Sequence, residues 1–279
     1  MAGTFAEKVA GTFFVIFLYK PMHVNKLRVF FGVAMIAAAA ACGGPQEAAP
    51  TPPPNAKRVD QSKTGNVSGR VTIEGTVPAN AALKVEGDSY CSQRNPNGAT
   101  AENFVVDNGG LENVFVYVKD GLGDYWFDVP TEPVKLDQQA CRYHPHVLGI
   151  RAWQKLAISN SDDTLHNVHA LAKVNPEFNK GQNVKNMVDQ KVFTKPEVMV
   201  RFKCDVHGWM QAFVGVLDHP YFAVTHDGGK FELKDLPAGT YTVEAWHEKL
   251  GTMTQSVTLG EKESKELNFT FKSSAGSSN

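Results

Sequence analysis

Residues 201–217 read RFKCDVHGWMQAFVGVL. Within them a thiol, an imidazole and a thioether follow one another at intervals of three residues, at Cys204, His207 and Met210. The loop that carries them is enclosed by two β-rich runs, Val198–Phe202 and Ala212–Leu217. A short loop held between two strands can turn several such donors toward one point, so this stretch indicates a β-protein with a metal site at a strand end.

A fourth donor lies upstream. The β-rich run Lys155–Ser159 is followed by His166-Asn167-Val168, so the two segments supply His, Cys, His and Met in that chain order. Two imidazoles and a thiolate in a trigonal arrangement, with a weak axial thioether, form the ligand set of a mononuclear blue-copper site. Soft sulfur ligands favour Cu(I) and imidazoles retain Cu(II). One geometry then serves both states, and little reorganisation accompanies electron transfer.

At these residues the chain resembles the cupredoxins, the plastocyanin and amicyanin family, from about Gln138 to Asp218. His166-Asn167-Val168 is similar to the family's first-ligand motif, and C-x2-H-x2-M is similar to the short ligand loop of amicyanin. The resemblance implies a Greek-key β-sandwich with one type 1 copper. It assigns His166 and His207 as equatorial nitrogen ligands, Cys204 as the short thiolate bond and Met210 as the long axial contact.

The chain departs from the family pattern at Asp205, an acid beside the thiolate, and in the insert Val174–Lys195. Both leave the reduction potential and the docking surface open.

Trp209 has two interpretations. It packs in the core at a strand start, or it lies with Gly208 in an apolar patch around an exposed edge of the His207 ring. That patch would be an electron port for a redox partner, since transient redox encounters use small interfaces.

A second C-x2-H occurs at Cys141 and His144, followed by His146. Chain order argues against it as the copper loop, because Cys141 precedes the first ligand and no Met follows at the matching distance. Two alternatives remain for Cys141: a disulfide with Cys91 in an oxidising compartment, or a second metal site with the two nearby histidines. His169 would face away from His166 on an extended strand and is interpreted as a surface residue or as one that supports a ligand.

The rest of the chain favours the all-β class. Short β-rich runs alternate with glycine turns such as Asn108-Gly109-Gly110 and Asp227-Gly228-Gly229, and no long amphipathic helix is indicated. Besides the runs named above, strands are predicted at Ser68–Glu74, Phe104–Val106, Val114–Val118, Lys230–Leu233, Thr240–Ala245 and Glu266–Phe271.

A boundary is predicted near Asp218-His219-Pro220. Beyond it, HDGGKFELKDLPAGTYTVEAWHE at 226–248 resembles the carboxypeptidase-regulatory-like or transthyretin-like β-sandwiches. This resemblance implies a fold more than a function. The predicted domains are therefore a cupredoxin-like domain at 67–218, with its ligand-bearing part at 138–218, a smaller β-sandwich at 219–273 and a tail at 274–279. Whether the strand within Ser68–Pro78 pairs with the smaller sandwich or with the middle segment is left open.

The N-terminal part predicts export. Residues 22–44 read MHVNKLRVFFGVAMIAAAAACGG, a basic start, a short apolar run and small residues at a cleavage point, so 1–41 is predicted to be a signal peptide. Met22 is the more natural start, which leaves open whether 1–21 belong to the protein. Ala39–Cys42 resembles a bacterial lipobox and implies a lipid anchor on Cys42; the alternative is an ordinary signal with a chance cysteine. The Pro- and Ala-rich residues 42–66 then form a tether.

Charge limits the partners. The chain has 28 Lys+Arg, 29 Asp+Glu and a net charge of −1, so nucleic-acid binding is not expected. A lipid anchor would place the protein in a bacterial cell envelope, on the periplasmic or extracellular face, and at the outer membrane where one exists.

The leading hypothesis is an electron carrier that contacts a redox protein transiently and transforms no small-molecule substrate, so it is not expected to be an enzyme. A protein that binds copper for storage, delivery or sensing would have clustered Met or Cys ligands beyond these four, whereas the 7 Met here are scattered. A multicopper oxidase or a nitrite-reductase-like enzyme would need additional copper centres built from several H-x-H pairs, and only His144-Pro-His146 has that form. The last alternative is a metal-free structural envelope lipoprotein.

Overall fold

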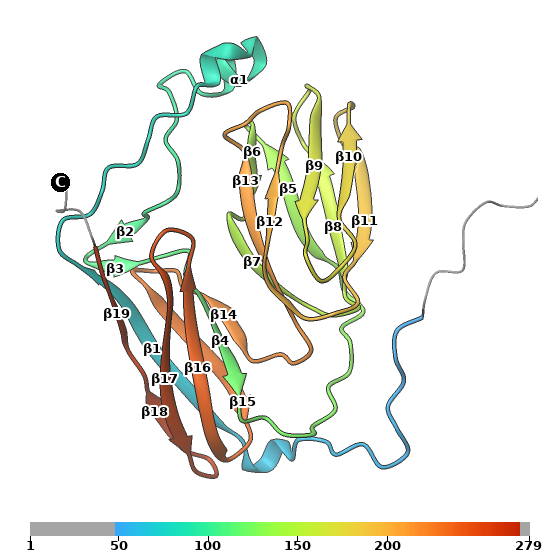
Figure 1. Cartoon of the computed structure of the whole chain (residues 1–279), viewed down its shortest axis with the longest axis vertical. Helices are drawn as coiled ribbons and strands as arrows, with labels where there is room; N and C mark the ends of the chain where they lie inside the picture. The colour runs from blue at the N-terminus through green and yellow to red at the C-terminus, as the bar shows by residue number, and fades with distance from the viewer. Residues whose placement is uncertain (1–47, 274–279) are drawn as a thin grey trace, which may run out of the picture. The chain divides into compact units, whose positions relative to one another are not determined.

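Several strands of the protein show alternating burial of their side chains. The computed structural model describes residues 48–273, and nearly all regular structure there is β (Figure 1). In β15 (Lys230–Leu236), for example, Phe231 and Leu233 are buried while Lys230 and Glu232 are exposed. This period of two residues is that of a strand with one face in a core. The predicted all-β class is confirmed.

The ligand-bearing sandwich consists of a five-stranded sheet in the order β10-β9-β12-β13-β7 and a four-stranded sheet in the order β11-β8-β5-β6. Its strands are β5 (Val134–Gln139), β6 (Arg142–His144), β7 (Val147–Arg151), β8 (Lys155–Asn160), β9 (His166–Leu171), β10 (Phe178–Gln182), β11 (Val188–Val192), β12 (Glu197–Lys203) and β13 (Gln211–Leu217). Leu156 and Ile158 of one sheet share a buried cluster with Phe202 and Val214 of the other. The insert noted at 174–195 forms β10 and β11 and so extends both sheets.

The second sandwich has a six-stranded sheet, in which β15-β1-β3-β2 form a path and β18 and β19 pair with β1, and a four-stranded sheet in the order β14-β4-β16-β17. Its other strands are β1 (Gly65–Glu74), β2 (Val106–Asp107), β3 (Gly110–Leu111), β4 (Phe115–Asp120), β14 (Phe222–Val224), β16 (Gly239–His247), β17 (Gly251–Leu259), β18 (Ser264–Glu266) and β19 (Phe269–Lys272). Val71 and Phe269 of one sheet meet Val116 and Val243 of the other in its core.

These pairings answer the question left open for β1. Ser68 pairs with Glu232 in antiparallel fashion, and Val71 pairs with Phe269 in parallel. The strands between 65 and 120, which the sequence analysis placed in one domain with the ligands, thus belong to the same sheets as the strands after 222. The predicted domain 67–218 is corrected accordingly: the ligand-bearing sandwich runs from 134 to 217. Local alternation marks a strand, but it does not reveal a partner that lies more than a hundred residues away.

A glycine pair permits close contact between the two sandwiches. Gly149 of β7 and Gly215 of β13 are paired in register. A Cβ on Gly215 would lie 2.4 Å from the ring of Phe115, and one on Gly149 would lie 2.4 Å from the ring of Phe222. Because both positions lack a side chain, the two rings can pack directly on the β7–β13 pair. Phe115 joins Val147, Phe213 and Leu217 in a third buried cluster there.

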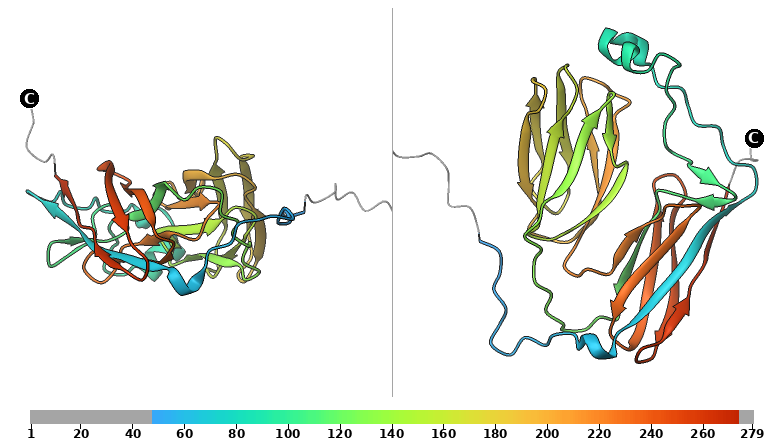
Figure 2. Two further views of the ribbon diagram at one scale, coloured as in Figure 1. Left: turned by 90° about the horizontal axis from the view of Figure 1, so that it is seen from below. Right: turned by 180° about the vertical axis from the view of Figure 1, so that it is seen from behind.

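The segment between β1 and β2 lies outside the sheets. It carries a 3-10 turn, η2 (Val85–Gly87), and the short helix α1 (Ser89–Arg94), for which no sequence pattern gave an expectation. The right view of Figure 2 shows α1 from behind, within the long connection between β1 and β2. A further 3-10 turn, η1 (Gln61–Lys63), precedes β1.

The predicted signal peptide, Cys42, the start of the tether and the tail at 274–279 lie outside the described residues. Within residues 48–273, no helix has the length and apolar character needed to cross a membrane.

Candidate metal centre

Two neighbouring strands bring the predicted ligands together. His166 is the first residue of β9, and Cys204 directly follows the last residue of β12. The two strands are antiparallel, with Lys203 opposite His169, so the start of β9 and the end of β12 meet at one edge of the sheet. The loop 204–210 then leads into β13. The predicted position of the site at a strand end is therefore what the structure shows.

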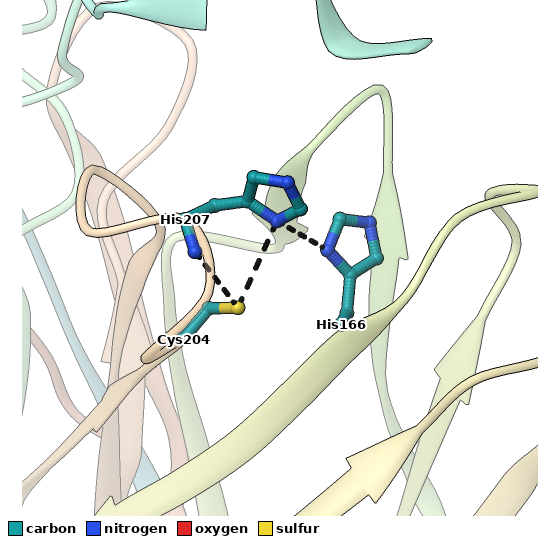
Figure 3. Close-up of side chains that lie close together, drawn as sticks. All are labelled: His166, Cys204 and His207. Carbon is teal, nitrogen blue, oxygen red and sulfur yellow. Dashed lines mark hydrogen bonds between the residues drawn. The ribbon is translucent and has the colours of Figure 1, made fainter. Parts of the chain in front are cut away.

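His166, Cys204 and His207 converge at this edge (Figure 3). Nδ1 of His166 lies 3.0 Å from Nδ1 of His207, which in turn lies 3.9 Å from Sγ of Cys204. One donor atom of each residue falls within 4.8 Å of the others. The side chains are buried, with exposed fractions of 0% for His166, 1% for Cys204 and 2% for His207. Two imidazole nitrogens and one sulfur facing a common point form a donor set suited to a soft or borderline metal ion.

Backbone hydrogen bonds shape the loop. The N–H of His207 donates to Sγ of Cys204 at 3.4 Å, the N–H of Met210 donates to the carbonyl of His207 at 2.9 Å, and the N–H of Cys204 donates to the carbonyl of Met210 at 3.2 Å. These three hydrogen bonds close the C-x2-H-x2-M stretch into a turn. The donors are thus held in place by the loop itself.

Met210 lies in the same buried cluster as Cys204, with an exposed fraction of 1%. Its backbone position at the end of the loop is compatible with an axial ligand. The axial contact of its sulfur remains a prediction.

Asn167 fastens the two ligand segments to each other, a role the sequence analysis did not assign. Its backbone N–H donates to Sγ of Cys204 at 3.5 Å. Its Oδ1 accepts the backbone N–H of Asp205 at 2.6 Å and lies 3.2 Å from Sγ of Cys204. Its Nδ2 donates to Asn179 of β10 at 2.7 Å. The His-Asn pair in the sequence was the only local signal for this contact.

The acid beside the thiol points away from it. The Asp205 carboxylate accepts from Lys203, Asn179, His169 and Asn167. The hydrogen bond from Lys203, with those from the other donors, lowers the pKa of this carboxyl well below its usual range despite some desolvation. His169, expected at the surface or in a supporting role, lies between Asp205 and Glu177 at 2.9 and 2.7 Å.

The surroundings favour the thiolate that a metal requires. Burial of Cys204 opposes ionisation, but its contacts with the His166 and His207 rings and with the backbone N–H of Asn167 outweigh it and lower the pKa of the thiol to about 6. A thiol ionised near neutral pH loses no proton when it binds a metal, which favours binding.

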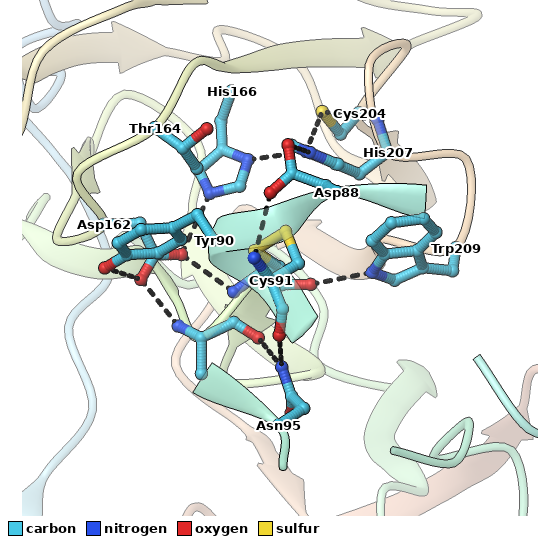
Figure 4. The surroundings of a disulfide bond; sticks show 12 residues. Asp88, Tyr90, Cys91, Asn95, Asp162, Thr164, His166, Cys204, His207 and Trp209 are labelled. Carbon is cyan, nitrogen blue, oxygen red and sulfur yellow. Dashed lines mark hydrogen bonds and ion pairs between the residues drawn. A yellow bond between two sulfur atoms is a disulfide. The ribbon is translucent and has the colours of Figure 1, made fainter. Parts of the chain in front are cut away.

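Each histidine is also held by a carboxylate on its far nitrogen (Figure 4). Nε2 of His166 lies 2.9 Å from Asp162, and Nε2 of His207 lies 3.4 Å from Asp88. The ring nitrogen that faces Cys204 is therefore Nδ1 in both cases. Burial lowers the pKa of His166, but the hydrogen bond to Asp162 and the nearby Cys204 outweigh it, so the pKa is raised overall. Sequence reasoning identified neither carboxylate, since Asp88 is 119 residues from His207.

The expected exposed edge of His207 is not observed. The ring is 2% exposed because Asp88, at the start of α1, covers its Nε2 side. Trp209 is half-buried, its ring centroid lies 5.1 Å from that of His207, and its indole N–H donates to the carbonyl of Cys141 at 3.0 Å. The predicted electron port of His207 and Trp209 is corrected in this respect: the α1 segment lies between His207 and solvent.

Cys91 and Cys141 form a disulfide, the first of the two alternatives (Figure 4). Both residues are fully buried. Cys141 therefore offers no thiolate for a second metal site with His144 and His146. His146 instead pairs with Glu248 of the second sandwich, and His144 is exposed. Cys204 is the free cysteine of the described residues.

Neither a protein-family model nor a curated protein sequence matches the chain. Among solved structures, a Cu(I) form of an amicyanin mutant is 23% identical over 32% of this chain and 86% of its own, with a TM-score of 0.28. A purple cupredoxin from Nitrosopumilus maritimus is 20% identical over 30% of this chain and 98% of its own, with a TM-score of 0.26. A copper-containing nitrite reductase from Thermus scotoductus is 14% identical over 54% of this chain and 28% of its own, with a TM-score of 0.30. At TM-scores this low, the choice of metal depends on the geometry described above.

Proposed function

We propose that this protein binds one copper ion through His166, Cys204 and His207, with Met210 as axial ligand, and carries electrons. The observation that supports the proposal most strongly is the convergence of two imidazole Nδ1 atoms and one thiol Sγ within 4.8 Å at a buried strand edge. The three donors are buried and come from two segments of the chain that are about forty residues apart, yet they face a common point. A metal-free envelope lipoprotein would have no use for such a cluster.

The donor set favours copper among the common metals. A thiolate and a thioether stabilise Cu(I), and imidazoles stabilise Cu(II), so a bound copper ion would supply a one-electron couple. The chain's own part is to keep the donors in one place. Asn167 links the two ligand segments, Asp162 and Asp88 hold the imidazoles, and the loop hydrogen bonds fix Cys204. Donors held this firmly move little when the charge of the metal changes.

The same features support an electron carrier over an enzyme. The donors are buried, and electrons can reach a buried site through packed side chains. The partner is then a redox protein that makes transient contact.

Membrane attachment forms the second part of the proposal. It is based on the signal and lipobox patterns that end at Cys42. The Cys91–Cys141 disulfide is compatible with the oxidising side of a bacterial envelope, where such bonds persist. Replacement of Cys42 by Ser should release the protein from membranes into the soluble fraction. Unchanged membrane association of the Cys42→Ser protein would contradict a lipid anchor.

The electron-carrier function is tested by metal analysis with cyclic voltammetry of the full chain. We expect one copper per chain and a reversible one-electron wave, with both lost in Cys204→Ser. Copper bound without a reversible wave would contradict a carrier function and favour storage or delivery.

A further inference from the structure

Asp88 contacts two groups with its two carboxylate oxygens. Oδ1 accepts the backbone N–H of Cys91 at 2.9 Å, which caps the first turn of α1. Oδ2 lies 3.4 Å from Nε2 of His207. A helix cap needs a single oxygen, and Ser, Thr or Asn supplies one as well as Asp does. Capping alone therefore does not account for the contact of the second oxygen, Oδ2, with His207.

The segment that carries Asp88 is fastened to the ligand-bearing sandwich at several points. The disulfide joins Cys91 to Cys141, in the turn between β5 and β6. Asn95 donates to the carbonyl of Ala140 at 3.1 Å. Tyr90 donates through its hydroxyl to Asp162, the carboxylate that holds His166, at 3.2 Å. Residues 85–95, called here the α1 segment, thus touch the supporting groups of both histidines, although the chain reaches them from the second sandwich.

The two histidines differ in the origin of their support. Asp162 lies in the loop that follows β8, in the same sandwich as His166. Asp88 comes from outside that sandwich and is held there by a covalent crosslink. The orientation of His207 thus depends on the α1 segment staying in place.

We propose that Asp88 is a positioning residue for the metal ligand His207, and that the disulfide-fastened α1 segment serves to deliver it. This inference depends on the proposed copper site for the identity of the metal. A carboxylate on Nε2 keeps the proton on that nitrogen and leaves the lone pair of Nδ1 directed toward Cys204. Outer carboxylates of this kind typically change metal affinity by about 10- to 100-fold.

The segment offers a matched control. Glu86 carries the same charge, lies two residues from Asp88 and is exposed. Asp88→Ser keeps an oxygen for the cap but is too short to reach His207. Asp88→Asn keeps the cap and places an amide beside the ring, where its N–H can donate to Nε2 and so favour a proton on Nδ1. Glu86→Ser and Glu86→Gln remove a charge from the same segment without touching the ligand.

The experiment uses the full chain and two readouts. In the metal-free protein, the ¹⁵N chemical shifts of the His207 ring report which nitrogen holds the proton. We expect the Nε2–H form in the wild type and both Glu86 variants, a mixture in Asp88→Ser and the Nδ1–H form in Asp88→Asn. In competition with a copper chelator, both Asp88 variants should bind copper about 10- to 100-fold more weakly than their Glu86 controls.

Asp88 variants that match their controls in both readouts would overturn the proposal. A weaker affinity with an unchanged tautomer would also overturn it, because the loss would then be a general structural effect. Should Asp88→Ser not fold, Asp88→Asn alone decides the question. The tautomer is measured without metal, so its outcome is separate from the electron-carrier proposal, which fails if the wild type shows no reversible copper couple.

Discussion

Nδ1 of His166 lies 3.0 Å from Nδ1 of His207, although 41 residues separate them in the sequence. Both far nitrogens lie near carboxylates, so Nδ1 is the nitrogen of each ring that is placed to bind a metal ion. Two lone pairs at this distance repel each other unless a cation or a shared proton lies between them. Cys204 adds a sulfur beside them, and the three side chains together offer a donor set to a metal ion.

Asn167 should be required for both stability and metal binding. Asn167→Ala removes the oxygen that accepts the N–H of Asp205 and the amide that donates to Asn179. Leaving such partly buried groups unpaired costs about 1–3 kcal/mol. Urea unfolding of the variant should show a free energy of unfolding lower by that amount, with weaker copper binding. Asn179→Ala is the control, since it removes one of these contacts but none to the ligand loop backbone. Equal effects of the two substitutions would contradict the assigned role.

Met210→Leu tests the axial ligand. Leu has nearly the same volume, so the buried position should tolerate it at a cost below about 1.5 kcal/mol. The three other donors should still bind copper. Loss of a weak thioether donor destabilises Cu(II) more than Cu(I), so the reduction potential measured by voltammetry should rise. An unchanged potential would show that the sulfur of Met210 is not a ligand, and complete loss of copper would show that its role is more than axial.

Gly215→Ala should destabilise the protein through the contact between the sandwiches. The added Cβ would lie 2.4 Å from the ring of Phe115, in a cluster that is closely packed. Overpacking of this kind costs about 1–3 kcal/mol. Gly181→Ala in β10 is the control, because a Cβ there meets no atom within 4 Å. Thermal unfolding should show a clear loss for the first variant and little change for the second. Equal melting temperatures would contradict direct packing of Phe115 on β13.

The disulfide should stabilise the fold as well as hold the α1 segment. Cys91 and Cys141 are 50 residues apart, and closing a loop of that length stabilises by about 4 kcal/mol on the chain-entropy model. The Cys91→Ala/Cys141→Ala double variant should therefore unfold at lower denaturant concentration. It should also show greater exposure of His207 to chemical modification, since the segment over the ring loses its covalent anchor. Protection of His207 equal to that of the wild type would show that noncovalent contacts are enough.

Local sequence was sufficient for much of the fold and for the ligand positions. Hydrophobic alternation marked strands such as β12 and β15, a continuous apolar run marked β13, and the fixed spacing of Cys204 and His207 indicated a shared site. The turn at Asp227–Gly229 was recognised because positive φ angles favour Gly and Asp, and all three residues have them.

The features that the sequence did not reveal are contacts between residues far apart in the chain. The pairing of β1 with β15 and β19 depends on partners far along the chain, so the domain boundary was misplaced. Asp88 shields His207 from solvent. In the sequence Asp88 is recognisable only as a helix cap, and a helix cap does not indicate a contact with the ligand loop. The loop sequence alone favours an exposed electron port, because the residue that covers His207 lies 119 residues earlier in the chain.

The central claim is that His166, Cys204 and His207 bind copper through a thiolate bond. The most direct measurement is the visible absorption spectrum of the full chain loaded with Cu(II). We expect an intense thiolate-to-copper charge-transfer band that saturates at one copper per chain and is absent in Cys204→Ser. A colourless Cu(II) protein, or a band that persists in Cys204→Ser, would contradict the claim.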